Sequence, residues 1–173
     1  MNSVFGSLFI VSTPLGNLKD ITLRALDIMK NSYLIAAEDT RKSQILLKEY
    51  KIKTKMISYH EHNSHKRIKT IISYLKDGKN ISLISDAGTP GISDPSYRLI
   101  RSAIENEITV NSIPGPSAFL TALTSSGLPT DNFFFAGFLP PKKGRKSKLE
   151  ELSKLNSTLI LYENPKRLLK TLN

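Results

Sequence analysis

The chain has 173 residues, of which 39% are hydrophobic, and it carries a formal net charge of +10 at pH 7 without a single cysteine. This length allows one domain, or one domain and part of a second. The lack of cysteine excludes disulfide bonds and thiolate metal sites, and a reducing cytoplasm is the expected compartment. Residues Met1–Ser7 lack the features of a signal peptide, and no apolar run approaches the roughly 18 residues of a membrane span, so no membrane association is expected.

The positive charge is concentrated in two segments. Residues 41–79 contain eleven Lys and Arg against three acids, and residues 138–173 contain nine against three. Residues 1–40 and 80–137 have balances of −1 and −3. An uneven basic charge of this kind indicates a nucleic-acid surface beside a small-molecule pocket, and a lysine-rich solvated surface is the alternative.

Short apolar runs alternate with stretches of helical periodicity through the first 115 residues. Helices are expected at residues 21–29, 66–75 and 97–104, the first of them capped by Asp20 or Thr22. The expected strands are Leu8–Ser12, Tyr33–Ala37, Lys55–Tyr59, Ile81–Ile84 and Ile108–Ile113. This alternation predicts an α/β domain with a mostly parallel five-stranded sheet.

Loops rich in small residues follow three of these strands, at Thr13–Leu18, Asp86–Pro95 and Pro114–Ala118. The carboxyl ends of parallel strands share one edge of a sheet, where α/β proteins bind ligands. Gly88 and Gly91 allow the backbone to approach a ligand closely.

The composition of the Asp86–Pro95 loop bears on its ligand. The loop contains two carboxylates and no cation, so a phosphate cradle is disfavoured and a ligand with hydroxyls, an amine or a positive centre fits better. An ordinary turn in which Asp94 caps the next helix is the alternative.

Two charged clusters remain ambiguous. Glu38–Arg41 ends the second strand, and these side chains either serve a site at the sheet edge or cap a helix and form a local ion pair. His60, His62 and His65 lie close together, but their spacing suits no familiar zinc site, so no metal is predicted.

A second α/β domain is expected from residue 116, which divides the chain into residues 1–115 and 116–173. Strands are expected at Phe133–Phe138 and Ser157–Tyr162, and helices at Lys148–Leu155 and Pro165–Leu172. Pro140–Lys146 forms a rigid basic loop. One strand pair with two helices buries too little to close a domain, so this second domain is expected to be incomplete in the chain.

Six groups of motifs follow one another from Leu8 to about Leu169. They are Ser12–Leu18 with Asp20–Leu26, Ala37–Arg41, Ser85–Pro95, Pro114–Ala118, Gly137–Pro140 and Tyr162–Arg167. In this order they resemble the tetrapyrrole-methylase superfamily, and within it the methyltransferases of small-subunit ribosomal RNA. Ser96 and Asn164 depart from the pattern, which has a glycine and a serine at these positions.

The resemblance implies a fold, a reaction and partners. The fold is tetrapyrrole-methylase-like, with S-adenosylmethionine held between two α/β domains, usually in a homodimer. The reaction is 2′-O-methylation of a cytidine ribose in small-subunit (16S) ribosomal RNA, free or in the 30S particle. The alternatives are a methyltransferase acting on a small tetrapyrrole and a non-catalytic RNA-binding relative.

The resemblance and the charge pattern also suggest site residues. Those expected to line the cofactor site are Pro14, Leu15, Gly16, Asp86, Ala87, Gly88, Thr89, Ile92, Ser117, Ala118, Tyr162 and Glu163. Those expected to contact RNA are Arg41, Lys42, Lys142, Lys143, Arg145 and Lys146.

The catalytic candidates are Asp39, Arg41 and Asp86, with Glu38 beside them at the sheet edge. A sulfonium donor is cationic, so a neutral or acidic pocket suits it, and a ribose hydroxyl benefits from a base. Our hypothesis from the sequence is that Asp39 or Asp86 orients or deprotonates the hydroxyl while Arg41 holds phosphate.

Overall fold

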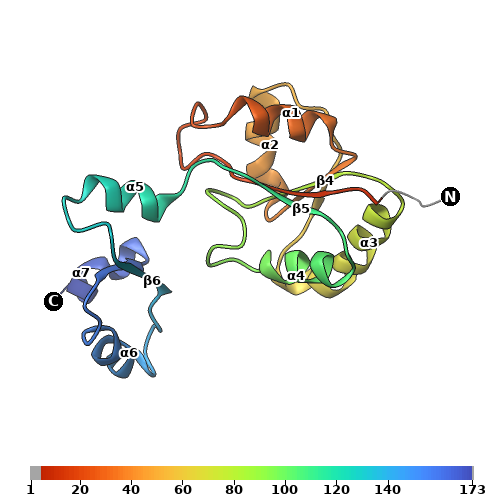
Figure 1. The fold of residues 1–173 in the computed structure, drawn as a ribbon. Helices are drawn as coiled ribbons and strands as arrows, with labels where there is room; N and C mark the ends of the chain where they lie inside the picture. Colours follow the sequence, from red (N-terminus) through yellow and green to blue (C-terminus); the bar gives the residue numbers. More distant parts are fainter. Residues whose placement is uncertain (1–4, 173) are drawn as a thin grey trace. The chain divides into compact units, whose positions relative to one another are not determined.

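The computed structural model describes residues 5–172, which form two compact units (Figure 1). The first unit extends to Ser117 and the second begins at Ala118, two residues later than the boundary expected from the sequence. Within the described residues, none of the helices combines the length and the apolar character needed to cross a bilayer.

The first unit is built on a five-stranded sheet in which every pairing is parallel. Its strands are β1 (Leu8–Val11), β2 (Leu34–Ala37), β3 (Met56–Ser58), β4 (Ile81–Ile84) and β5 (Val110–Ile113). Their order across the sheet is β3-β2-β4-β1-β5, so β1 and β4 are neighbours near the middle. The predicted α/β class and mostly parallel five-stranded sheet are confirmed.

Helices cover both faces of this sheet (Figure 1). Helices α1 (Leu23–Asn31) and α2 (Thr40–Glu49) pack on one face, and α3 (Ser64–Lys76) and α4 (Tyr97–Glu105) pack on the other. Along β2, Ile35 and Ala37 contact the first layer, whereas Leu34 and Ala36 contact the second. Burial on both faces explains why the strands are continuous apolar runs.

Side-chain caps determine where two of these helices begin. The Thr22 hydroxyl accepts a hydrogen bond from the Ala25 N–H at 3.1 Å, so Thr22, and not Asp20, caps α1. Asp39 caps α2, a helix whose bounds the sequence analysis did not give. The residue before α4 is Ser96, whose own side chain makes no capping hydrogen bond. The Asp94 carboxylate accepts hydrogen bonds from the Ser96 N–H, at the start of the helix, and from the Gly91 N–H in the preceding loop.

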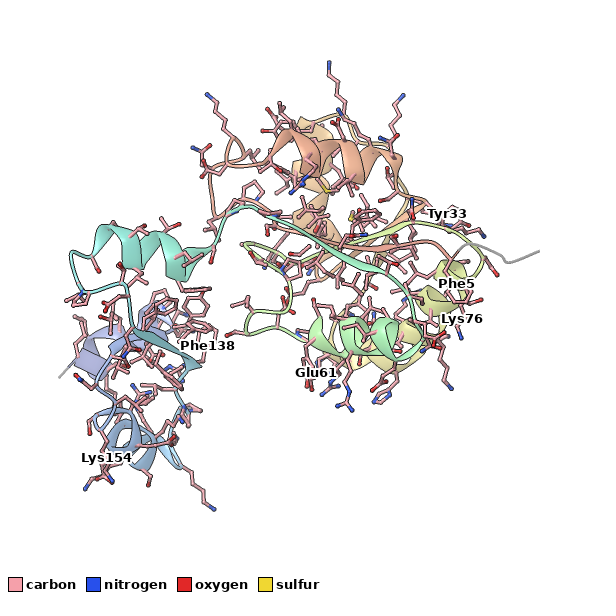
Figure 2. The ribbon with its side chains drawn as sticks, in the orientation of Figure 1. Phe5, Tyr33, Glu61, Lys76, Phe138 and Lys154 are labelled. Carbon is pink, nitrogen blue, oxygen red and sulfur yellow. The ribbon has the colours of Figure 1, made fainter. Side chains whose placement is uncertain are left out.

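The short 3-10 helix η1 (Glu61–Asn63) follows β3. The Glu61 carboxylate, labelled in Figure 2, lies 3.7 Å from the guanidinium of Arg98 on α4. Among residues 5–172, no group of three His, Cys, Asp or Glu is placed to hold a metal ion.

The second unit contains one parallel strand pair, β6 (Phe133–Phe138) with β7 (Thr158–Tyr162). Its helical segments are α5 (Ala118–Ser125), α6 (Arg145–Leu152), η2 (Pro165–Arg167) and α7 (Leu168–Leu172). The sequence prediction placed the start of α6 three residues too late, because Gly144, with φ of +82°, allows the helix to begin at Arg145, within the segment Pro140–Lys146 that was expected to be a loop. The Phe119 ring stacks on Phe135 with 4.9 Å between the ring centroids.

The core of the first unit predicts how two leucine substitutions differ. Leu83 on β4 is fully buried, whereas Leu23 at the start of α1 is 81% exposed. We expect Leu83→Ala to lower the free energy of unfolding by about 2–5 kcal/mol, because it leaves a cavity in a packed core. Leu23→Ala should change it by less than about 0.5 kcal/mol. Urea unfolding followed by circular dichroism measures both, and equal effects would contradict this packing.

Candidate active site

The candidate site lies where β1 and β4 end side by side. The chain leaves β1 toward α1 on one face of the sheet and leaves β4 toward α4 on the opposite face. Such a divergence opens a crevice at the carboxyl edge of the strands, which is the usual ligand site of open α/β sheets. The sequence predicted that three loops rich in small residues meet at this edge. In the structure, the loops after β1, β4 and β5 lie there.

The loops after β1 and β4 are joined through their backbones. Thr13 and Gly88 exchange two hydrogen bonds, each 2.9 Å from nitrogen to oxygen. The Thr13 hydroxyl also donates to the Ser85 carbonyl oxygen at 3.1 Å. Gly88 has φ of +77°, and a Cβ there would lie 3.2 Å from Leu15 Cδ2. The position therefore favours glycine because of its backbone conformation, and a Cβ would also displace the Leu15 side chain slightly.

Two hydroxyl groups join the loop after β5 to the other two. The Ser12 and Thr89 hydroxyl oxygens are 2.9 Å apart, and Thr89 donates to the Pro116 carbonyl oxygen at 3.2 Å. A Cβ on Gly115 would lie 2.8 Å from the Cβ of Ser12, so this loop passes directly against the end of β1. Sequence reasoning missed Ser12, because a serine at a strand end gives no signal of its own.

A charged cluster connects the β4 loop to the end of β2. One Asp86 carboxylate oxygen accepts the Asp39 N–H at 3.0 Å, and the other accepts from Lys42 Nζ at 2.5 Å. The Asp86 N–H points to the Glu38 carboxylate at 3.4 Å. The hydrogen bond to Asp86 raises the pKa of Lys42 and keeps that side chain charged. The structure thus assembles the four acidic and basic candidates of the sheet edge, with Lys42 added.

The two adjacent carboxylates Glu38 and Asp39 differ in proton affinity. Both Asp39 oxygens accept hydrogen bonds from the Arg41 side chain, at 3.1 and 2.9 Å, which lowers the pKa of Asp39 to about 2. Burial raises the pKa of Glu38 above its ordinary value, since a desolvated carboxylate is less stable when ionised. Of these two, Glu38 is the better proton acceptor near neutral pH.

A cavity of about 170 Å³ lies beside this cluster, between the β1 loop and α2. Thr13, Gly16, Lys42, Ser43 and Asp86 contribute to its wall. The Ser43 hydroxyl is buried and has no hydrogen-bond partner among the described residues. A buried hydroxyl without a partner is uncommon in proteins and is available to a polar ligand group.

Two apolar side chains extend from the loops at this edge. Leu15 in the β1 loop and Ile92 in the β4 loop are 38% and 39% exposed. Gly16, with φ of +116°, has no atom within 4 Å of the position that a Cβ would occupy. The predicted cofactor residues that belong to the loops after β1 and β4 are Pro14, Leu15, Gly16, Asp86, Ala87, Gly88, Thr89 and Ile92.

The remaining predicted cofactor residues lie at the unit boundary or in the second unit. Ser117 ends the first unit and Ala118 begins α5. The Tyr162 ring packs against Phe135 and against Phe138, which Figure 2 labels, with ring centroids 5.0 and 5.4 Å apart.

Glu163 is held by groups of its own unit. One carboxylate oxygen accepts from the Asn164 N–H at 2.7 Å and from Arg167 at 2.9 Å. The other accepts from Thr171 at 2.7 Å and from Arg145 at 3.1 Å. The hydrogen bond from Thr171 is the largest of the influences that lower the pKa of Glu163 to about 2.

The side chains predicted to contact RNA have different surroundings. Lys142, Lys143 and Lys146 are exposed at the basic loop and the start of α6. Arg145 instead donates to Glu163, Thr171 and the Pro140 carbonyl oxygen, so it ties this loop to β7 and α7. In the first unit, the Arg41 side chain is 90% exposed although it pairs with Asp39.

Comparison with known sequences identifies the family. A sequence profile described as Tetrapyrrole (Corrin/Porphyrin) Methylases matches residues 7–173. This chain belongs to the tetrapyrrole methylase family. The fold agrees, because a crystal structure of diphthine synthase superposes with a TM-score of 0.73 at 15% identity, covering 92% of this chain and 66% of that one.

Within the tetrapyrrole methylases, curated relatives specify the branch. A protein of Halalkalibacterium halodurans is 52% identical over 169 residues, covering 97% of this chain and 58% of the relative. A protein of Thermotoga maritima is 48% identical over 167 residues, covering 96% of this chain and 75% of the relative. Both are named ribosomal RNA small subunit methyltransferase I, which confirms the branch indicated by the motifs. The chain thus spans little more than half of one relative and three quarters of the other.

The Glu163 network predicts a pH-dependent contribution to stability. Because the pKa of Glu163 falls from 4.5 to about 2 on folding, its ionised form stabilises the folded state above pH 4.5. This contribution should disappear as the pH falls toward 2. Glu163→Gln should therefore lower the urea midpoint at pH 7, and the difference from wild type should close between pH 4.5 and 2.

The matched control is Glu150→Gln, because Glu150 is exposed and lies 3.9 Å from Lys146. We expect this substitution to shift the midpoint little at any pH, as is usual for exposed ion pairs. A pH-independent loss in Glu163→Gln would contradict the assignment of the stabilisation to the ionised carboxylate.

Proposed function

We propose that this chain is the main part of a methyltransferase that uses S-adenosylmethionine to methylate small-subunit ribosomal RNA, at the 2′-hydroxyl of a cytidine. The observation that carries the proposal is identity near 50% along nearly the whole chain to relatives named for that RNA. The protein would act in the cytoplasm, on free RNA or on the 30S particle, as a homodimer. The two basic segments favour RNA over a small tetrapyrrole as the acceptor.

The residues at the sheet edge fit the proposed cofactor. S-adenosylmethionine combines a cationic sulfonium with an uncharged adenine, and when bound it supplies an electrophilic methyl group. The edge offers the carboxylates of Glu38 and Asp86 together with the exposed apolar side chains of Leu15 and Ile92. Residues 80–97 contain no Lys or Arg, and the cation that pairs with Asp86 is Lys42 of α2.

The remaining residues of the edge have roles in activating and binding the acceptor. A ribose hydroxyl is a weak nucleophile, and a nearby base of suitable pKa accelerates its attack by roughly 10²- to 10⁴-fold. We assign this role to Glu38 in place of Asp39, whose pKa of about 2 makes it a poor proton acceptor. Asp86 fixes Lys42, and Asp39 fixes Arg41, so that both cations can hold RNA phosphate or a developing alkoxide.

The direct test is methyl transfer by the full-length protein. It is incubated with S-adenosylmethionine carrying a labelled methyl group and with small ribosomal subunits from cells that lack the enzyme. We expect label at one RNA position that resists alkaline cleavage, since a 2′-O-methyl group blocks attack on the adjacent phosphate. Label in a tetrapyrrole but not in RNA would support the alternative acceptor. Absence of S-adenosylmethionine binding would support a non-catalytic RNA-binding relative.

The assignment of Glu38 predicts how the chemical step depends on pH. Glu38→Gln should lower the single-turnover rate at pH 7 by roughly 10²- to 10⁴-fold, because the proton acceptor is lost. The wild-type rate should fall as acid protonates Glu38, and the variant should lack this limb of the pH profile. Affinity for S-adenosylmethionine, measured by calorimetry, should change little.

Asp39→Asn provides the comparison, since asparagine retains a capping side chain on α2 but loses the ion pair with Arg41. It should weaken RNA binding more than it slows the chemical step. A larger loss of single-turnover rate in Asp39→Asn than in Glu38→Gln would overturn the assignment.

A further inference from the structure

A second hollow of the first unit lies on the outer side of α2. It is an open groove of about 770 Å³ between α2, the segment before β3, and β3 itself. Arg41, Lys53 and Lys55 are the charged residues of its wall, together with the polar side chains of Thr40 and Gln44. The wall includes no acidic residue, so the groove suits an anion or a polyanion.

Hydrogen bonds fix the backbone segment that carries the two lysines. The Thr54 hydroxyl donates to the Met29 carbonyl oxygen at 2.6 Å, and the Lys55 carbonyl oxygen accepts from Ile35 N–H at 2.9 Å. Successive side chains of an extended segment point to opposite sides. Lys53 and Lys55 therefore lie on the same side of the segment, and both are exposed and belong to the groove wall, to which Thr54 between them also contributes. Within residues 5–172, neither makes an ion pair.

Arg41 connects this groove to the candidate active site. Its guanidinium is fixed by two hydrogen bonds to Asp39, yet the side chain remains 90% exposed and forms part of the groove wall. The next residue, Lys42, belongs to the wall of the 170 Å³ cavity and pairs with Asp86. The first turn of α2 therefore places one cation in each hollow.

We propose that this groove binds the phosphate backbone of the substrate RNA next to the nucleotide that is methylated. The proposal rests on the proposed function, because it takes ribosomal RNA as the substrate. Two lysines that are unpaired among the described residues, together with Arg41, whose partner Asp39 lies outside the wall, complement a run of phosphates. Gln44 and Thr40 can hydrogen-bond to ribose or phosphate oxygens. Each lysine–phosphate contact releases a counterion, and this release makes binding at about 0.1 M salt roughly five- to eightfold stronger than at about 1 M salt.

The test compares two double variants of equal charge in the full-length protein. The groove variant combines Lys53→Ser and Lys55→Ser, which removes both lysines from the groove. The α3 variant combines Lys66→Ser and Lys69→Ser, two exposed lysines that form no ion pair among the described residues. Helix α3 packs on the face of the sheet opposite to α2. Small ribosomal subunits lacking the modification serve as the RNA probe. The readouts are KM, kcat, the salt dependence of subunit binding, and the affinity for S-adenosylmethionine.

For the groove variant, we expect KM and the dissociation constant for subunits to rise at least roughly tenfold at about 0.1 M salt. The slope of log affinity against log salt should fall by about 2, one for each lysine. The kcat and the affinity for S-adenosylmethionine should stay near wild type, and so should all four readouts of the α3 variant. Lys53→Arg with Lys55→Arg should restore binding, since it restores the charge.

Equal losses in the groove and α3 variants would overturn the proposal, because they would indicate a general effect of net charge. Unchanged KM and an unchanged salt slope in the groove variant would also overturn the proposal. The two lysines would then serve to keep β3, which is an edge strand, from pairing with other chains. The experiment distinguishes failure of this groove proposal from failure of the proposed function. In the latter case the wild-type protein transfers no methyl group to RNA, whereas the binding measurements still report on the groove.

Discussion

The reciprocal backbone hydrogen bonds between Thr13 and Gly88 are the constraint on which the site depends. A parallel sheet brings strand ends to one edge but does not order the loops that follow them. Here the backbone pair and the hydroxyl chain from Ser12 through Thr89 to Pro116 join three loops into one rigid structure. Ligand groups at this edge therefore meet a surface that is already organised, which lowers the entropic cost of binding.

Electrostatics at this edge separate neighbouring residues into different roles. Asp39 is held ionised by Arg41, whereas burial makes Glu38 easier to protonate, although the two carboxylates are adjacent in sequence. In the first turn of α2, Arg41 pairs with Asp39 and Lys42 pairs with Asp86, so neighbouring cations are held by different carboxylates. The start of α2 thus contributes a cation to each of the two hollows of the first unit.

The second unit uses its basic residues in two ways. Arg145 and Arg167 converge on the Glu163 carboxylate, which is 7% exposed, and together with Thr171 they fix the basic loop and α7 to the end of β7. Lys142 and Lys143 remain exposed on that loop. A sequence motif rich in Lys and Arg therefore contains both structural cations and cations free to meet RNA, and only their partners distinguish them.

The sequence alone determined the fold class, the five parallel strands and the loops that meet at the site, because strand burial and small-residue turns leave strong local patterns in Leu8–Val11, Ile81–Ile84 and Asp86–Pro95. Ordered motifs determined the family. Tertiary structure decided which side chains pair, since the contacts of Ser12 with Thr89 and of Lys42 with Asp86 join residues 77 and 44 positions apart. It also decided proton affinities, because desolvation and hydrogen bonding depend on three-dimensional surroundings that no local pattern encodes.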